Sequence, residues 1–268
     1  MTSKAPRDYT AITELPGGLV TAEQQARLCQ RYALAREHAA GRRVLEVACG
    51  AGLGLGCVAE AADWLAGGDF TAAVLETAQT HYGGAVPLVR FDAQRLPFSD
   101  ASFDLILCFE AIYYFPQPEL FLAECRRVLA EQGLLLIGSE NKAWPHFAAG
   151  PLSAAYYSAP ELRALLAQSG FGPVEFFGSF AAETYSPNQR LRASLRQLIT
   201  ASGVFRRWPQ AREWLKPLVY RNAAPLRYDL CRGDTPLPPL VPLDLQTPHP
   251  EYKVIYALAR NAAMKRET

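Results

Sequence analysis

The sequence has almost no imbalance of charge. Its 268 residues carry 27 lysines and arginines against 26 aspartates and glutamates, which leaves a formal net charge of +1. A nearly neutral chain lacks the overall field that attracts nucleic acid or an anionic membrane. It also lacks a long apolar run, because the longest uncharged stretch, 143–160, is interrupted by Pro145, His146, Gly150 and Pro151. We therefore expect neither a membrane span nor a nucleic-acid partner.

Cysteine and histidine are sparse and show no metal-binding spacing. None of the six cysteines forms a Cys-x-x-Cys pair, and several lie within apolar runs, so we expect reduced, buried thiols. The four histidines are dispersed, and we expect no bound metal. The first eight residues carry charge but no apolar segment follows them. The sequence therefore shows no export signal and predicts a cytoplasmic protein.

Apolar runs alternate with helical patterns along most of the chain. A capping box at Thr21 and Gln24 begins a predicted helix that extends to about Ala40. Strands are predicted at 43–48, 64–69, 85–90, 103–109, 133–138, 172–177 and 252–259, and further helices at 57–63, 72–81, 119–130 and 158–169. Strands that alternate with helices at this spacing indicate an α/β fold, with a mostly parallel sheet covered by helices on both faces.

The first predicted strand contains Glu46 and runs into a turn with glycine at every second position from Gly50 to Gly56. Such a turn lets a ligand approach the backbone closely, and the helix that follows offers unpaired N–H groups. The dinucleotide pattern Gly-x-Gly-x-x-Gly fails by one residue, and no Gly-Lys-Ser/Thr phosphate loop is present. The Glu46 carboxylate would repel a pyrophosphate and attract an amine-bearing ligand.

Two more carboxylates follow the next two predicted strands. Asp69, nineteen residues after Gly50, is placed to accept hydrogen bonds from ribose hydroxyls. Asp92 follows the third strand and is placed to accept a hydrogen bond from an adenine amino group. Three carboxylates around a nucleoside, without a phosphate binder, predict S-adenosylmethionine as the cofactor.

Four motifs occur in order along this region: Val44-Leu-Glu-Val-Ala-Cys-Gly-Ala-Gly52, Gly68-Asp-Phe-Thr71, Phe91-Asp-Ala-Gln-Arg-Leu-Pro-Phe98 and Ser102-Phe-Asp-Leu-Ile-Leu-Cys-Phe-Glu-Ala111. Together they resemble the motifs of class I S-adenosylmethionine-dependent methyltransferases, especially the broad group that includes ubiquinone and menaquinone biosynthesis methyltransferases. The resemblance covers about residues 40–142. It implies a Rossmann-like, seven-stranded sheet, with S-adenosylmethionine as methyl donor and S-adenosylhomocysteine as product. The Gly67-Gly68 pair departs from the family, which commonly has a single glycine after an apolar residue there.

The resemblance also implies which residues contact the cofactor. The ribose would bind Asp69, with Phe70 beside the adenine ring, and the adenine amino group would bind Asp92 with Ala93. A backbone contact is implied at Phe109. The methionine moiety would lie against the first strand and the glycine turn, at Glu46, Gly50, Gly52 and Gly54.

Residues after the fourth and fifth strands are candidates for the acceptor site, because ligands bind at the carboxyl ends of the strands in such sheets. Tyr113, Tyr114 and His146 follow these strands. A hydroxyl acceptor needs a base, and Tyr114 and His146 are its candidates. The alternatives are a pocket wall for the tyrosines and a solvated loop position for His146. No Asn/Asp-Pro-Pro-aromatic motif, which amino-methylating enzymes share, follows Phe109. We therefore expect a small-molecule or saccharide-type acceptor, methylated on oxygen.

The chain departs from the strand–helix alternation at 180–250, where ten lysines and arginines face five aspartates and glutamates. Leucines at helical spacing predict an α-helical insertion before the last strand, and prolines from Pro236 onward predict an extended segment. We divide the chain into an N-terminal segment and helix that form a lid (1–40), a cofactor-binding core (41–179), this basic insertion as a substrate cap (180–250), and the final strand with its tail (251–268).

Within the insertion, the stretch 189–221 carries eight lysines and arginines against a single acid, Glu213. One interpretation is an amphipathic helix packed over the core. The other is a surface for an anionic substrate, a peripheral membrane contact or RNA. The alternative functions are therefore methylation of an RNA or lipid-linked acceptor, or a catalytically silent cofactor-binding partner subunit. A silent subunit has no need of Glu46, Asp69 and Asp92.

Overall fold

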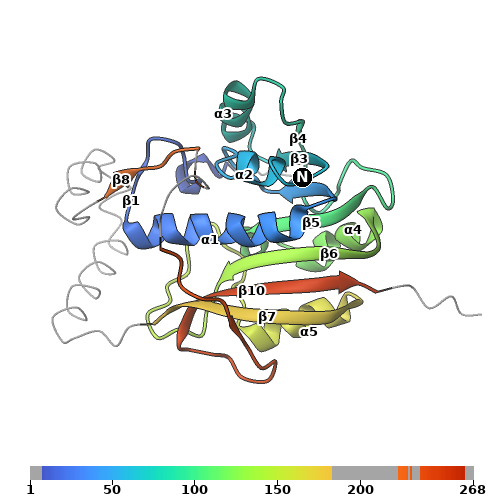
Figure 1. Cartoon of the computed structure of the whole chain (residues 1–268). Helices are drawn as coiled ribbons and strands as arrows, with labels where there is room; N and C mark the ends of the chain where they lie inside the picture. Colours follow the sequence, from blue (N-terminus) through green and yellow to red (C-terminus); the bar gives the residue numbers. More distant parts are fainter. Residues whose placement is uncertain (1–7, 183–222, 229, 231–235, 263–268) are drawn as a thin grey trace, which may run out of the picture.

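The computed structural model describes residues 8–182, 223–228, 230 and 236–262. Their main feature is a sheet of eight strands in the order β4-β3-β2-β5-β6-β10-β7-β9 (Figure 1). In chain order the strands are β2 (Arg43–Val47), β3 (Trp64–Asp69), β4 (Leu88–Arg90), β5 (Phe103–Phe109), β6 (Leu129–Glu140), β7 (Phe171–Ala181), β9 (Val241–Pro242) and β10 (Tyr252–Asn261). The first five are parallel to one another, and β10 lies antiparallel between β6 and β7.

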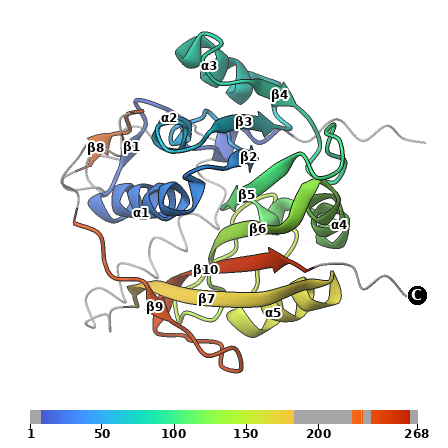
Figure 2. The ribbon, with the colours of Figure 1, turned by 45° about the vertical axis from the view of Figure 1, so that its right-hand side comes forward.

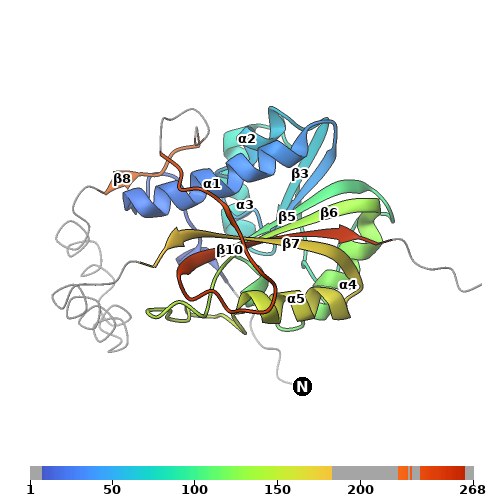
Figure 3. The same ribbon diagram turned by 60° about the horizontal axis from the view of Figure 1, so that its bottom comes forward.

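Helices cover both faces of this sheet (Figure 2). One face packs against α1 (Ala22–Ala39), α2 (Leu55–Ala59) and α3 (Ala72–Tyr82), and the other against α4 (Pro118–Val128) and α5 (Ala159–Gln168). In β5, Leu105 and Leu107 face the first layer, whereas Ile106 and Cys108 face the second. Figure 3 shows α5 beside β7, with α1 across the opposite face. The central strands read as unbroken apolar runs because both of their faces are buried.

The predicted capping boxes form and fix the starts of two helices. Before α1, the Gln24 N–H donates to Thr21 Oγ1 at 3.2 Å, and the Thr21 N–H donates to Gln24 Oε1 at 2.9 Å. Before α5, Ser158 and Glu161 form the same motif. Reciprocal bonds of this kind satisfy N–H groups that a helix start otherwise leaves unpaired. The start of α1 matters for the site, since this helix forms one side of the cavity described below.

The observed strands differ from the expected ones at the edges. The predicted strand 85–90 is reduced to β4, because Pro87 cannot donate to a ladder. The proline-rich segment contributes the two-residue edge strand β9, which makes eight strands rather than seven in the described part of the sheet. A separate two-stranded sheet joins β1 (Leu19–Val20) to β8 (Ala224–Pro225). The predicted helix and basic stretch at 189–221 lie outside the described residues.

Four cysteines are buried thiols outside any disulfide, as expected: Cys29, Cys49, Cys108 and Cys125. Cys57, however, is disulfide-bonded, so the expectation of six reduced thiols is wrong. The spacing of cysteines in a sequence does not by itself reveal which of them pair in the folded protein. In the described ranges, none of the helices is long and apolar enough to cross a membrane, and no group of residues is suited to hold a metal ion.

Candidate cofactor and acceptor site

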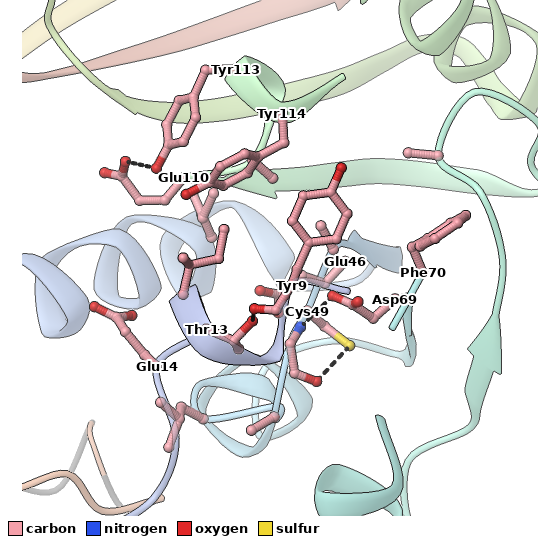
Figure 4. Close-up of a pocket in the computed structure, with 18 of the residues that line it drawn as sticks. Tyr9, Thr13, Glu14, Glu46, Cys49, Asp69, Phe70, Glu110, Tyr113 and Tyr114 are labelled. Atoms are coloured by element: carbon pink, nitrogen blue, oxygen red, sulfur yellow. Dashed lines mark hydrogen bonds between the residues drawn. The ribbon is translucent and has the colours of Figure 1, made fainter. Parts of the chain in front are cut away.

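A cavity of about 410 Å³ opens at the carboxyl ends of β2, β3, β4 and β5 (Figure 4). The N-terminal segment, including the 3-10 helix η1 (Thr10–Ile12), and α1 close its other sides. Nine of the residues selected from the sequence line it: Glu46, Gly50, Asp69, Phe70, Asp92, Ala93, Phe109, Tyr113 and Tyr114. Residues from four strand ends therefore meet in one space large enough for a small ligand.

The turn after β2 is held against β3 by Asp69. The Gly50 N–H donates to Asp69 Oδ2 at 3.0 Å, and the Thr71 N–H donates to Oδ1 at 2.8 Å. Gly50 has a φ of +55°, a conformation that favours glycine, and a Cβ there would lie 2.9 Å from the Thr13 methyl. Burial raises the pKa of the Asp69 carboxyl. Asp69 thus shapes the turn as well as facing the cavity.

Gly52 and Gly54 do not line the cavity, although the resemblance implies a contact with the cofactor. Gly54 caps the start of α2, and a Cβ on it would overlap the Tyr32 ring. A Cβ on Gly52 would meet side-chain atoms of Leu55 and Tyr82 at 3.0 Å. Both glycines therefore allow tyrosines from α1 and α3 to pack behind the turn.

Glu46 is a buried carboxylate with one free oxygen. Its Oε1 accepts a hydrogen bond from the Tyr32 hydroxyl at 2.7 Å, whereas Oε2 is buried without a partner among the described residues. Burial raises the pKa of Glu46 to about 7. An unpaired buried carboxylate oxygen is costly, and Glu46 lines the cavity. A ligand with a cationic donor, such as an ammonium group, would satisfy it.

The opposite end of the cavity is more open and partly aromatic. Asp92 is exposed at the rim, where Oδ1 accepts from the Gln94 N–H at 2.9 Å. Phe70 meets Tyr9 edge-on, with ring centroids 6.4 Å apart, and the Tyr9 N–H donates to Thr71 Oγ1 at 3.4 Å. The N-terminal segment therefore lies across the cavity at the side where an adenine ring would bind (Figure 4).

A family model described as a methyltransferase domain matches residues 45–137, the part of the chain that carries the glycine turn, Asp69 and Asp92. The chain carries a class I S-adenosylmethionine-dependent methyltransferase domain. It is 31% identical over 147 residues to a protein of Mycolicibacterium smegmatis described as a probable S-adenosylmethionine-dependent methyltransferase, and the match covers 53% of this chain and 56% of that protein.

A second relative is described as a probable phthiotriol/phenolphthiotriol dimycocerosates methyltransferase 2 of Mycobacterium ulcerans. It is 38% identical over 99 residues, which are 35% of this chain and 37% of the relative. The chain thus spans about half or less of the length of these relatives. A structure from Thermotoga maritima, described as a possible histamine N-methyltransferase, covers 90% of this chain and 91% of its own, with a TM-score of 0.56 at 15% identity. That likeness supports the fold alone.

The side of the cavity at which the sequence predicts the acceptor begins where β5 ends. Tyr113 and Tyr114 lie in the 3-10 helix η2 (Ile112–Tyr114), and both line the cavity. Burial raises the pKa of both hydroxyls, so they remain donors rather than bases. Glu110, which immediately follows β5, also lines the cavity. Sequence reasoning passed over Glu110, although its place directly after the predicted fourth strand was a usable signal.

Two arginines of α1, Arg27 and Arg31, also line this side of the cavity. Arg31 Nη2 lies 3.2 Å from Glu14 Oε2, and Arg27 Nη2 lies 2.7 Å from Glu23 Oε1. Both guanidinium groups are therefore paired with carboxylates. Both arginines lie in a helix before the glycine turn and belong to no recognisable motif, so the sequence does not predict that they line the cavity.

His146 is not among the residues that line the cavity. It lies in the loop after β6, where its ring packs edge-on against Trp144 at 5.8 Å. The Trp144 indole N–H in turn donates to Glu140 Oε1 at 3.2 Å. The expected contact between His146 and an acceptor therefore finds no support in the structure, because this ring packs on Trp144 and is not among the residues that line the cavity.

Proposed function

We propose that this protein transfers the methyl group of S-adenosylmethionine to the hydroxyl oxygen of a small-molecule acceptor. The observation that carries the proposal is the convergence of Glu46, Gly50, Asp69 and Asp92 on one cavity within the matched domain. A dinucleotide would bring a pyrophosphate beside the buried Glu46, which disfavours it.

The lining residues fit this cofactor in charge and shape. The unpartnered Oε2 of Glu46 suits the ammonium of the methionine moiety. Asp69 and Asp92 suit the ribose hydroxyls and the adenine amino group, with Phe70 against the ring. When bound, the sulfonium supplies an electrophilic methyl group, and the protein contributes mainly the alignment of the acceptor with that carbon.

The cofactor assignment is tested by calorimetric titration with S-adenosylhomocysteine. Asp69→Asn removes the charge and keeps only one of the two oxygens that accept from the Gly50 and Thr71 N–H groups. We expect it to weaken binding about tenfold or more, since hydrogen bonds to a charged group are the stronger ones. Asp63→Asn, at an exposed position before β3, is the matched control. Equal affinity in the two variants would contradict the assignment.

A larger, lipid-linked acceptor is the second candidate. It is favoured by the relative named for phthiotriol/phenolphthiotriol dimycocerosates and by the basic stretch 189–221. Incubation of the protein and S-adenosylmethionine with separate aqueous and lipid extracts, followed by mass spectrometry, distinguishes the two candidates. A catalytically silent subunit would form no S-adenosylhomocysteine with either extract.

A further inference from the structure

Glu110 presents its carboxylate from an uncommon backbone position. Its φ of +49° lies in the left-handed region, which residues other than glycine adopt rarely and often at functional sites. Its N–H donates to the Gly138 carbonyl at 2.8 Å. Oε2 accepts from the Tyr113 hydroxyl at 2.9 Å and from the Glu140 N–H at 3.3 Å. The neighbouring strand and η2 therefore hold this carboxylate in one place.

Both side-chain hydrogen bonds of Glu110 end on Oε2. Oε1 accepts none from the residues that the structure describes, and Glu110 lines the cavity. In Figure 4 the carboxylate lies beside Tyr113, and the rings of Tyr9 and Tyr114 lie between it and Asp69. Among the described residues, Oε1 is therefore left without a hydrogen-bond donor, on a carboxylate at the side of the cavity away from Asp69.

Aromatic rings form much of the surrounding wall. Tyr9 and Tyr114 are in contact, with ring centroids 5.4 Å apart, and Tyr113 is stacked on Tyr156 at 4.0 Å. Rings favour a flat, apolar ligand body. A phenolic hydroxyl has a pKa of ~10. A side-chain base therefore removes its proton more readily than the proton of an aliphatic alcohol, whose pKa is higher.

We propose that Glu110 is the catalytic base that takes the hydroxyl proton of a flat, phenolic acceptor bound against the Tyr9 and Tyr114 rings. The proposal rests on the methyl transfer proposed above. The acceptor oxygen forms a bond to the methyl carbon while the bond between that carbon and sulfur breaks. The electron pair of the broken bond stays on sulfur, which changes from a sulfonium to a thioether. The hydroxyl proton passes to Glu110, and the product is an aryl methyl ether.

Binding to the protein saturated with S-adenosylhomocysteine tests the contact. The probes are para-cresol and para-methylanisole, which differ in whether the oxygen carries a proton. Glu110→Gln should weaken para-cresol binding by about tenfold or more, because a hydrogen bond to a charged group is lost. Any affinity for para-methylanisole should be the same in wild type and variant. Glu131→Gln, at an exposed position in β6, is the control and should bind both probes like the wild type.

Turnover tests the proton transfer. With S-adenosylmethionine, the wild type should convert para-cresol to para-methylanisole, and Glu110→Gln should lower kcat by about a hundredfold or more. Glu110→Asp retains a carboxylate and should recover part of that loss. Unaltered affinity for S-adenosylhomocysteine in both variants shows that they are folded.

Three results overturn the proposal. The first is that para-cresol does not bind, and the second is that the wild type methylates para-toluidine, the amine analogue, but not para-cresol. The third is equal turnover of para-cresol by wild type and Glu110→Gln. A wild type that does not bind S-adenosylhomocysteine refutes the underlying methyl transfer instead. The two failures are therefore distinguishable in the same titrations.

Discussion

Cofactor affinity should fall as Glu46 becomes protonated. The carboxyl is buried, its Oε2 has no partner among the described residues, and burial raises its pKa to about 7. A ligand ammonium would pair with the ionised form and not with the neutral acid. Binding therefore has to release a proton from Glu46 in the pH range at and below 7, which links affinity to pH.

The size of this effect follows from the fraction of Glu46 that is ionised before binding. With a pKa of about 7, the ionised fraction is about 76% at pH 7.5 and about 3% at pH 5.5. If only the ionised form binds, the affinity for S-adenosylhomocysteine falls about 25-fold between these two pH values. Without the raised pKa, a carboxyl near 4.3 would stay ionised throughout, and the affinity would change by less than about 10%.

Isothermal titration calorimetry at pH 5.5, 6.5 and 7.5 measures this dependence, and repeating it in buffers of different ionisation enthalpy counts the protons released. Glu46→Gln should bind weakly and without this slope. Constant affinity in the wild type, or the same slope in the variant, refutes the linkage to Glu46.

Three further outcomes are expected. Because the folded-state pKa of Glu46 is raised, its contribution to stability is lost as pH rises from about 4.5 to 7. In urea unfolding, the free energy of unfolding of Glu46→Gln relative to the wild type should therefore increase by about 3 kcal/mol between pH 4 and pH 8. A difference that does not change with pH would argue against this. Gly54→Ala should lower the free energy of unfolding by about 1–3 kcal/mol, because its Cβ would overlap Tyr32. Gly84 has open space around it but a φ of +91°, so Gly84→Ala should lower the free energy of unfolding less, through backbone strain alone. Tyr9→Ala removes ring contacts with Phe70 and Tyr114 and should speed S-adenosylhomocysteine release about tenfold in stopped-flow fluorescence; unchanged release would mean that Tyr9 does not cover the bound ligand.

The side of the cavity where we propose that the cofactor binds could be predicted from the sequence, because its lining residues lie at fixed offsets from strand ends. Asp69 closes β3 and Asp92 follows β4, so a correct prediction of the strands places both carboxylates at one sheet edge. The strand positions do not, however, predict which glycines of the turn face the cavity. Whether a glycine faces a ligand or a packed tyrosine depends on Tyr32 and Tyr82, which belong to other helices and have no fixed spacing to the turn.

The acceptor half could not be predicted in this way. Glu110 acquires its place from a left-handed backbone and from bonds to Tyr113 and β6, none of which a sequence pattern specifies. His146 was selected by the same rule as Tyr114, since each follows a strand. In the loop after β6, however, His146 packs on Trp144 and is not among the residues that line the cavity. Position after a strand therefore indicates a candidate only when the following segment turns back over the sheet edge.

The similarity to known methyltransferases covers only part of the cavity wall. The matched domain begins at residue 45, whereas Tyr9, Glu14, Arg27 and Arg31 come from the N-terminal segment and α1 and line the same cavity. Much of the wall on the proposed acceptor side thus lies outside the region that defines the methyltransferase domain. A match to the family model covers the glycine turn and Asp69, which we propose to bind the cofactor, but it does not extend to the N-terminal segment and α1. The acceptor of this protein has therefore to be inferred from its own N-terminal segment and Glu110, and the cresol series tests that wall directly.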